Sequence, residues 1–242
     1  MVAIFKKEVH AFFSSLIGYL VIGVFLVLLG LIMFVFPDTS VLEYPYATMG
    51  QLFDNAPLIF LFLIPAITMR MFAEERQNGT IEFLLTKPVR KADIILGKYL
   101  ASMTLVLFAL LPTLLYYWTI SRLGSPPGNL DSGAVLGSYL GLLLLAGCFT
   151  AIGLFASTLS TNQITGFVAA TFLCFLLYYG FFFFSKLPVF FGRGDVLVQM
   201  LGIDFHYEAI SKGVIDSRNV VYFLSVIGFF LFGTQLALER VR

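Results

Sequence analysis

The sequence predicts an all-α membrane protein with six membrane-spanning helices. Of its 242 residues, 59% are hydrophobic and only 12% are charged, whereas soluble domains average about 25% charged residues. The mean hydropathy is +0.94, and charge-free runs cover residues 11–37, 55–69, 99–121, 132–185 and 219–238. These runs lack the alternation of barrel strands, and an open sheet would leave backbone groups unpaired in lipid, so the spans are helices.

The charge-free runs give six spans when the longest is divided and the second is extended. A span needs about 20 apolar residues. Residues 132–185 are long enough for two helices, with a break in the polar cluster 157–163. Residues 55–69 can continue past Arg70 if that side chain snorkels to the interface. The spans are therefore expected at about 16–36, 55–72, 99–120, 134–156, 164–185 and 219–237.

The distribution of Lys and Arg predicts that both termini are cytoplasmic. With the N-terminus inside, the inner segments hold ten of these residues and the outer segments hold five, as the positive-inside rule requires. The first outer loop carries three acidic residues and no basic one. The first span is too long for a signal-peptide core and is followed by no small-residue cleavage site, so we expect it to be retained.

Residues 2–15 predict an amphipathic helix before the first span. Val2, Phe5, Val9 and Phe12 recur at steps of three and four residues, and polar residues fill the other face. Such a helix would lie in the inner membrane interface. The alternative is an ordinary basic flank that only orients the first span.

Small residues line one face of the fourth span. Gly133, Gly137 and Gly141 recur at four-residue steps, and such a face allows another helix to approach closely. The pattern favours packing within the chain over a dimer interface. Pro65, in the middle of the second span, predicts a kink there, which could serve either as a hinge or as a packing feature.

Residues 187–218 form a long, partly apolar outer segment whose spacing predicts short helices. An element of this length is usually functional or part of a cap. His206 and Glu208 lie two residues apart within it, but two candidate ligands are too few to predict a metal site. The cysteines, Cys148 and Cys174, lie in apolar runs and show neither a disulfide framework nor zinc-type spacing.

Motifs for nucleotide binding and catalysis are absent from the sequence. The Gly97-Lys98 pair has Ala92 where a phosphate loop has its first glycine, and neither H-E-x-x-H nor G-x-S-x-G occurs. The spans lack the carboxylate or histidine that ion-coupled carriers keep in the membrane. We therefore expect no catalytic residue, no metal and no cofactor in this chain, and no nucleic-acid partner. Any driving energy has to come from another protein.

Charge is concentrated between the second and third spans. Together with Arg70, residues 73–98 hold ten of the 29 charged side chains, which comprise 15 Lys and Arg and 14 Asp and Glu. Such a segment is where a chain otherwise embedded in lipid can meet a soluble partner.

The middle of this charged segment predicts a short helix. Asn78-Gly79 breaks the preceding structure, and Thr80 can cap a new helix whose first turn holds Glu82. Its apolar face consists of Ile81, Leu84 and Leu85, and Pro88 ends it. Because a helix this short is marginal alone in water, the face either folds back on the membrane surface or docks into a groove of a soluble protein.

The stretch EERQNGTIEFLLTKPVRKADIILGKYLA, residues 74–101, resembles the signature of ABC-2 type permeases of ABC transporters. The resemblance extends over the chain, through the N-terminal helix, the six spans and the pattern H-x-E-x-I-x-x-G-V-I-D at residues 206–216. Within the family the chain is most similar to the permease of the gliding-motility system. Permeases for copper-enzyme maturation share most of these features.

The resemblance implies a cytoplasmic coupling helix, an outer re-entrant segment before the last span, and a single six-span domain over residues 1–242. In that scheme Glu74, Glu75 and Arg76 contact the ATPase or anchor the loop. The implied ATPase-coupling residues are Glu74, Glu75, Arg76, Gly79, Thr80, Ile81, Glu82, Leu84, Leu85 and Pro88. The outer segment is marked by His206, Glu208, Lys212 and Gly213.

The resemblance further implies a permease subunit of the bacterial inner membrane that is not itself an enzyme. A separate cytoplasmic ABC ATPase would bind ATP and Mg, and its hydrolysis would drive export or other transmembrane work in gliding motility. A second permease chain, identical or related, and a further membrane or periplasmic subunit would complete the assembly. The alternative is a transmitter of signal or force that transports nothing. The family's substrate-lining positions share no motif, so no substrate is predicted.

Overall fold

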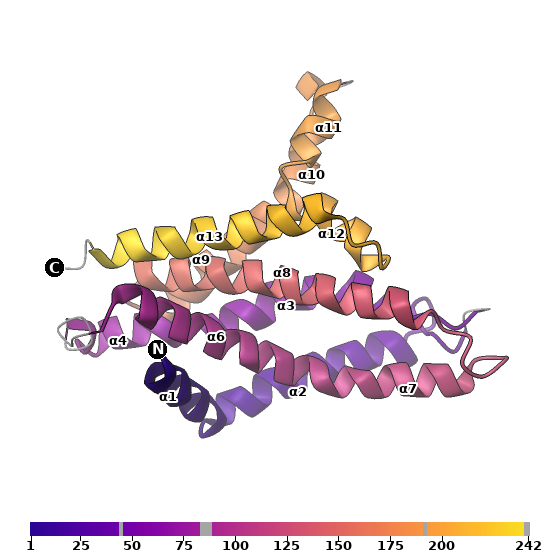
Figure 1. Cartoon of the computed structure of the whole chain (residues 1–242), viewed down its shortest axis with the longest axis horizontal. Coiled ribbons are helices and arrows are strands. Elements are labelled where there is room, and N and C mark those ends of the chain that lie inside the picture. Colours follow the sequence, from indigo (N-terminus) through magenta and orange to yellow (C-terminus); the bar gives the residue numbers. More distant parts are fainter. Residues whose placement is uncertain (44–45, 83–88, 191–192, 240–242) are drawn as a thin grey trace.

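The computed structural model describes residues 1–43, 46–82, 89–190 and 193–239, and the regular structure in these ranges is helical. Six helical segments are long and apolar enough to cross a membrane. They lie along the long axis of an elongated bundle, except for the end of the fifth, which turns away from it (Figure 1). The predicted all-α membrane fold is confirmed. The six segments are Leu16–Phe34, Gly50–Gln77, Lys91–Leu123, Ser132–Leu159, Gln163–Ser185 and Ser217–Glu239.

The centre of the bundle is α8 (Ser132–Leu159), which packs against α3 (Gly50–Thr68), α9 (Gln163–Phe175) and α13 (Ser217–Glu239). Its glycines permit close contact within the chain, as predicted. A Cβ at position 141 would lie 2.5 Å from the side chain of Ile210, and one at position 137 would lie 2.8 Å from the carbonyl oxygen of Gly213.

The second span is divided at Met69, four residues after Pro65, into α3 and α4 (Arg70–Gln77). The buried Ser157 hydroxyl fills the break in the backbone ladder. It donates to the Met69 carbonyl oxygen (2.9 Å) and accepts from the N–H groups of Phe72 and Ala73 (both 3.1 Å). A side chain inserted in this way is a recognised cause of a helix kink.

The helices extend further than the charge-free runs predicted. The second span reaches Gln77 rather than residue 72, and the third, α6 (Lys91–Leu110), η1 (Leu111–Thr113) and α7 (Leu114–Leu123), begins at Lys91 rather than at residue 99. Only residues 78–90 therefore connect them, and not 73–98. The prediction placed the loop where the charged residues lie, but several of them belong to the helix ends and are paired inside the protein.

The fourth span likewise passes through the polar residues that were expected to end it. The Thr158 hydroxyl donates to the Phe155 carbonyl oxygen at 2.6 Å, and Ser157 bonds as described above. Because both hydroxyls have partners, α8 continues to Leu159 instead of ending at residue 156.

The N-terminal residues form α1 (Val2–Phe13), which packs against α6 and against the start of α2 (Leu16–Phe34) (Figure 1). Arg70 lies at this junction, with its guanidinium 4.8 Å from the centre of the Phe12 ring and 3.4 Å from the Ser15 hydroxyl. The predicted helix is present. Its placement in the membrane interface remains a prediction.

The segment before the last span contains the predicted short helices. After α9 come a π-helical turn η2 (Leu176–Gly180), α10 (Phe181–Ser185), η3 (Pro188–Phe190), α11 (Arg193–Gln199) and α12 (Ile203–Ser211). In Figure 1, α10 and α11 extend away from the bundle, whereas α12 lies back beside α8.

Asp195 ties α11 to the end of α10. Gln199 Nε2 donates to Asp195 Oδ1 (2.6 Å) and to the Ser185 hydroxyl (3.1 Å), and Lys186 Nζ lies 3.7 Å from Asp195 Oδ2. Hydrogen bonds from Ser185 and Gln199, together with the charge of Lys186, hold the pKa of Asp195 below its usual value. The carboxylate thus favours the folded form of this hairpin above its ordinary pKa.

Candidate functional site

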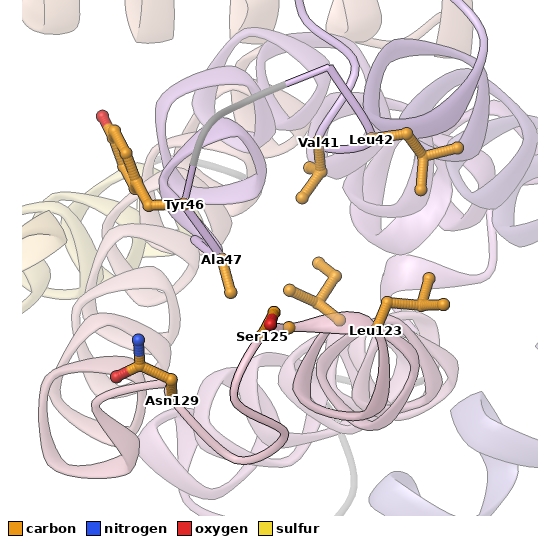
Figure 2. A pocket seen from close by; sticks show the side chains of 9 residues that line it. Val41, Leu42, Tyr46, Ala47, Leu123, Ser125 and Asn129 are labelled. Carbon is orange, nitrogen blue, oxygen red and sulfur yellow. The ribbon is translucent and has the colours of Figure 1, made fainter.

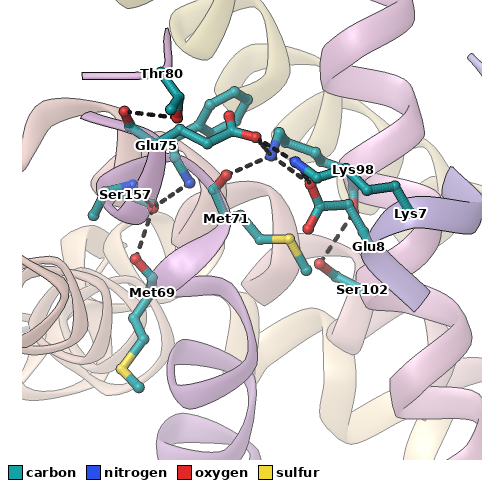
Figure 3. Close-up of polar contacts among 11 residues, drawn as sticks. Lys7, Glu8, Met69, Met71, Glu75, Thr80, Lys98, Ser102 and Ser157 are labelled. Carbon is teal, nitrogen blue, oxygen red and sulfur yellow. Dashed lines mark hydrogen bonds and ion pairs between the residues drawn. The ribbon is translucent and has the colours of Figure 1, made fainter. Parts of the chain in front are cut away.

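A buried ion cluster joins three helices at the end of the bundle that holds the N-terminus (Figure 3). Lys98 of α6, with a side chain only 1% exposed, donates to Glu8 Oε1 of α1 at 2.7 Å and lies 3.1 Å from Glu75 Oε1 of α4. It also donates to the Met71 carbonyl oxygen at 2.5 Å. Segments far apart in the sequence are therefore connected by a single ammonium group.

Lys7 balances the charge of this cluster from its solvent-exposed side. Its Nζ lies 2.9 Å from Glu75 Oε1 and 3.5 Å from Glu8 Oε1. Partial burial alone would lower the pKa of Lys7, but the hydrogen bond to Glu75 and the charges of Glu8 and Glu75 outweigh it and raise the pKa above 10.5. The cluster of two lysines and two glutamates is formally neutral, which reduces the cost of burying it.

Glu75 is only partly satisfied within the cluster. Its Oε1 contacts both lysines, whereas Oε2 is buried with no hydrogen-bond partner among the described residues. An unpaired buried acceptor costs about 1–3 kcal/mol. The burial of Oε2 therefore offsets part of the stabilisation that the two lysines give to Glu75.

The end of α4 is built to stop the helix and redirect the chain. Gly79 has a φ of +66°, a left-handed conformation that glycine adopts without strain. The Gly79 N–H donates to the Arg76 carbonyl oxygen (3.2 Å), and the Thr80 N–H donates to that of Glu75 (2.9 Å). This pair of bonds is the Schellman pattern of a helix C-terminus.

Residues 81–82 are helical and lie directly after Thr80, at the predicted start of the short helix. The Thr80 hydroxyl donates to the Glu75 carbonyl oxygen at 3.3 Å, so it also helps to complete the end of α4. Ile81 is buried against the rest of the chain, whereas Glu82 is exposed. The apolar face was expected either to fold back or to dock into a partner, and Ile81 is covered within the chain itself; its role in docking remains a prediction. Leu84, Leu85 and Pro88 lie outside the described residues.

The remaining charged residues predicted for this site point in different directions. Glu74 is exposed at the surface of α4. Glu75 belongs to the buried cluster, and Arg76 donates to the Thr158 carbonyl oxygen at the end of α8. Of the three, Glu74 is therefore free to meet a soluble partner, whereas Glu75 and Arg76 attach the segment to the bundle.

The four residues predicted to mark the outer segment lie on α12 and in the turn that follows it. The His206 ring stacks on Tyr222 with 3.9 Å between centroids, and its nitrogens lie 2.8 Å from Asn219 Oδ1 and 2.9 Å from the Met200 carbonyl oxygen. Gly213 has a φ of +85° and packs against Ala134 of α8. Glu208 and Lys212 form an exposed ion pair at 2.8 Å. Among the described residues no group of three His, Cys, Asp or Glu could hold a metal.

A pocket of about 300 Å³ lies at the opposite end of the bundle (Figure 2). The connection before α3 and the end of α7 enclose it, and its lining mixes apolar side chains with polar ones and includes no charged residue. The lining residues are Val41, Leu42, Tyr46, Ala47, Ile120, Leu123, Gly124, Ser125 and Asn129. Its chemistry does not distinguish one class of ligand from another.

Sequence reasoning missed the ion cluster, although its members were visible. Lys98 stood within a charged segment, and Glu8 lay on the polar face of the N-terminal helix. Lys98 is followed directly by a long apolar run, which hints that it is near the membrane. The choice of partner, 90 residues away in the case of Glu8, depends on how α1 packs.

Two comparisons with known proteins bear on this chain. A family model described as ABC-2 family transporter protein matches residues 38–203. This range includes α3, α4, α6, α8 and the connection between α4 and α6, but not α1 or α13. No curated protein matches the chain.

Proposed function

Because this chain belongs to the ABC-2 family of transporter proteins, we propose that it is a permease whose α4–α6 connection couples it to a separate ATPase. Family membership makes the chain a multi-pass membrane subunit of an ABC transporter rather than the ATPase itself, and it implies an ABC ATPase partner. The ATPase, and the ATP and Mg that it binds, would supply the driving energy. We also propose that the chain lies in the inner membrane with both termini in the cytoplasm and that the coupling residues are those that the resemblance implies.

The Lys98 cluster is the observation that supports coupling at this place. Residues 78–90 are attached on one side to α4, which carries Glu75, and on the other side to α6, which carries Lys98. Since Glu75 and Lys98 are 3.1 Å apart, a displacement of the connection moves both helices together. Glu8 extends the same attachment to α1. An ATPase that binds the connection in different positions as it hydrolyses ATP would thereby shift the second and third spans.

The exposed groups around the connection provide the contact surface. Glu74 and Glu82 are exposed, and Leu84 and Leu85 remain the predicted apolar contacts. The ATPase surface that complements them would be basic with an apolar groove.

Co-purification tests this proposal. The double variant Glu82→Lys with Leu84→Asp should abolish co-purification of the ATPase in mild detergent while leaving membrane insertion intact. A matched control is Glu208→Lys with Val214→Asp, which makes the same kinds of change in exposed residues of the outer segment and should retain the ATPase. Normal ATPase recovery with the first variant would overturn the proposed contact.

The biological setting that we propose is the gliding-motility system, on the basis of the resemblance of the chain, including the residues 206–216 pattern, to the permease of that system. Deletion of the gene in its own host should abolish surface spreading without affecting growth in liquid. A force or signal transmitter is a second candidate, because α10 and α11 extend from the bundle. Phe183 of α10, Val189 of η3 and Leu197 of α11 are exposed there. If this second candidate is correct, deleting residues 186–199 would remove motility and leave ATPase recruitment intact.

A further inference from the structure

A groove of about 480 Å³ opens between the ends of α4, α8 and α13, on the same end of the bundle as the ion cluster. Its volume falls within the range of about 300–1,000 Å³ that is typical of small-ligand sites. One side chain in the lining is charged, and the others are mostly apolar. The lining residues are Arg76, Phe155, Thr158, Leu159, Gly233, Leu236 and Ala237.

The apolar walls of the groove face outward from two candidate membrane spans. Leu159 is 60% exposed and Leu236 is 46% exposed. Gly233 helps to keep the groove open, since a Cβ at that position would already lie 3.2 Å from the Phe155 ring. Both α8 and α13 are long and apolar enough to cross a membrane, so these walls lie where lipid chains pack.

Arg76 places a cation at the rim of this groove, and most of its donors have no partner among the described residues. Its only hydrogen bond within the described residues goes to the Thr158 carbonyl oxygen, and no described carboxylate forms an ion pair with it. A guanidinium has five N–H donors in a planar fork that matches a phosphate in two-point contact. The site therefore offers one anion-binding group above an apolar surface.

We propose that this groove binds an anionic phospholipid, with the phosphate at Arg76 and an acyl chain along the α8 and α13 walls. The combination of a cation at a helix end with apolar walls below it complements a charged headgroup attached to a hydrocarbon chain. Basic pockets between transmembrane helices at the cytoplasmic surface bind acidic headgroups in this way. This site is separate from the proposed ATPase contact, although α4 contributes to both.

A single tryptophan reporter can measure this binding. The chain has one tryptophan, Trp118, on α7 at the opposite end of the bundle (Figure 1). In the variant Trp118→Phe with Leu236→Trp, the only tryptophan lies at the groove. Purified protein is reconstituted in phosphatidylcholine bilayers that contain either brominated phosphatidylglycerol or brominated phosphatidylcholine. The ratio of tryptophan quenching in the two samples gives the relative affinity for the anionic lipid. We expect a preference for phosphatidylglycerol of about fivefold or more, the effect of one basic residue near the surface.

Four further variants in this reporter background decide the outcome. Arg76→Gln should reduce the preference to within twofold, whereas Arg76→Lys should retain most of it. Arg90→Gln, which removes an exposed cation that does not line the groove, should leave it unchanged. Ala237→Phe narrows the apolar walls and should reduce quenching by both lipids, which keeps the test informative if Arg76→Gln does not fold. An unchanged preference in Arg76→Gln, or an equal loss in Arg90→Gln, would overturn the proposed site.

Discussion

Lys98 is buried inside the protein, where two carboxylates and a carbonyl oxygen take the place of water around its Nζ. A buried ion pair adds little net stability compared with well-packed apolar residues, but removing one partner strands the other. The contribution of Lys98 is therefore positional, since it fixes α1, α4 and α6 relative to one another. The sequence revealed its charge but not its burial, because the carboxylates that compensate it come from other helices.

Replacing Lys98 should destabilise the protein strongly. Lys98→Met leaves Glu8 and Glu75 buried without their main counter-ion, and breaking such a pair costs about 3–5 kcal/mol. The double variant Lys98→Met with Glu75→Met removes one stranded carboxylate and should lose less. Thermal unfolding of the purified protein in detergent measures both effects.

The matched control for Lys98 is Lys91→Met at the start of the same helix. Lys91 is partly exposed and lies 4.0 Å from Glu239, a surface pair worth about 0–1 kcal/mol. Equal melting temperatures for the variants at 91 and 98 would contradict the role assigned to the cluster.

At the scale of elements, the glycine face of α8 shows what periodicity can and cannot predict. The four-residue spacing of Gly133, Gly137 and Gly141 indicated close packing within the chain. It did not identify the partner, which is α12 and the turn at Gly213. The predicted end of the fourth span was also wrong, because Ser157 and Thr158 lie in the polar cluster that predicted a break. In the structure the Ser157 hydroxyl bonds to α4 and the Thr158 hydroxyl bonds within α8, so the helix continues past both.

A methyl group at position 141 should weaken the α8–α12 contact. In Gly141→Ala, the added carbon would lie 2.5 Å from Ile210 Cγ2 and 3.1 Å from its Cβ, and overpacking of this kind costs about 1–3 kcal/mol. Gly228→Ala in α13 is the matched control, because a Cβ there has nothing within 4 Å. Circular dichroism on heating should show a lower transition for Gly141→Ala alone.

At the scale of the whole molecule, the spans differ greatly in how much of them the chain covers. In the most apolar stretch of α8, 78% of residues are buried, against 11% in α13 and 22% in the α9–α10 span. Hydropathy predicted the number of spans because every span is apolar. Hydropathy could not predict which spans the protein buries, because a buried apolar helix and a lipid-exposed one have similar compositions.

The orientation predicted from Lys and Arg can be tested with introduced cysteines. Both native cysteines are buried, so they should not react with a membrane-impermeant maleimide. Asn129→Cys, at the α7–α8 connection, should be labelled in intact cells, whereas Gln77→Cys should be labelled only after the membrane is opened. Labelling in the reverse order would place both termini outside.

The kink at Met69 has a consequence for how the chain is made. The N–H groups of Phe72 and Ala73 bond to the hydroxyl of Ser157, a residue 84 to 85 positions later in the chain. On a growing chain these two groups emerge from the ribosome long before their partner exists, and lipid offers them no substitute. The second span must therefore remain hydrated at this end, or borrow another partner, until the fourth span has been synthesised. The final packing of the second span at this end therefore has to wait for the fourth span.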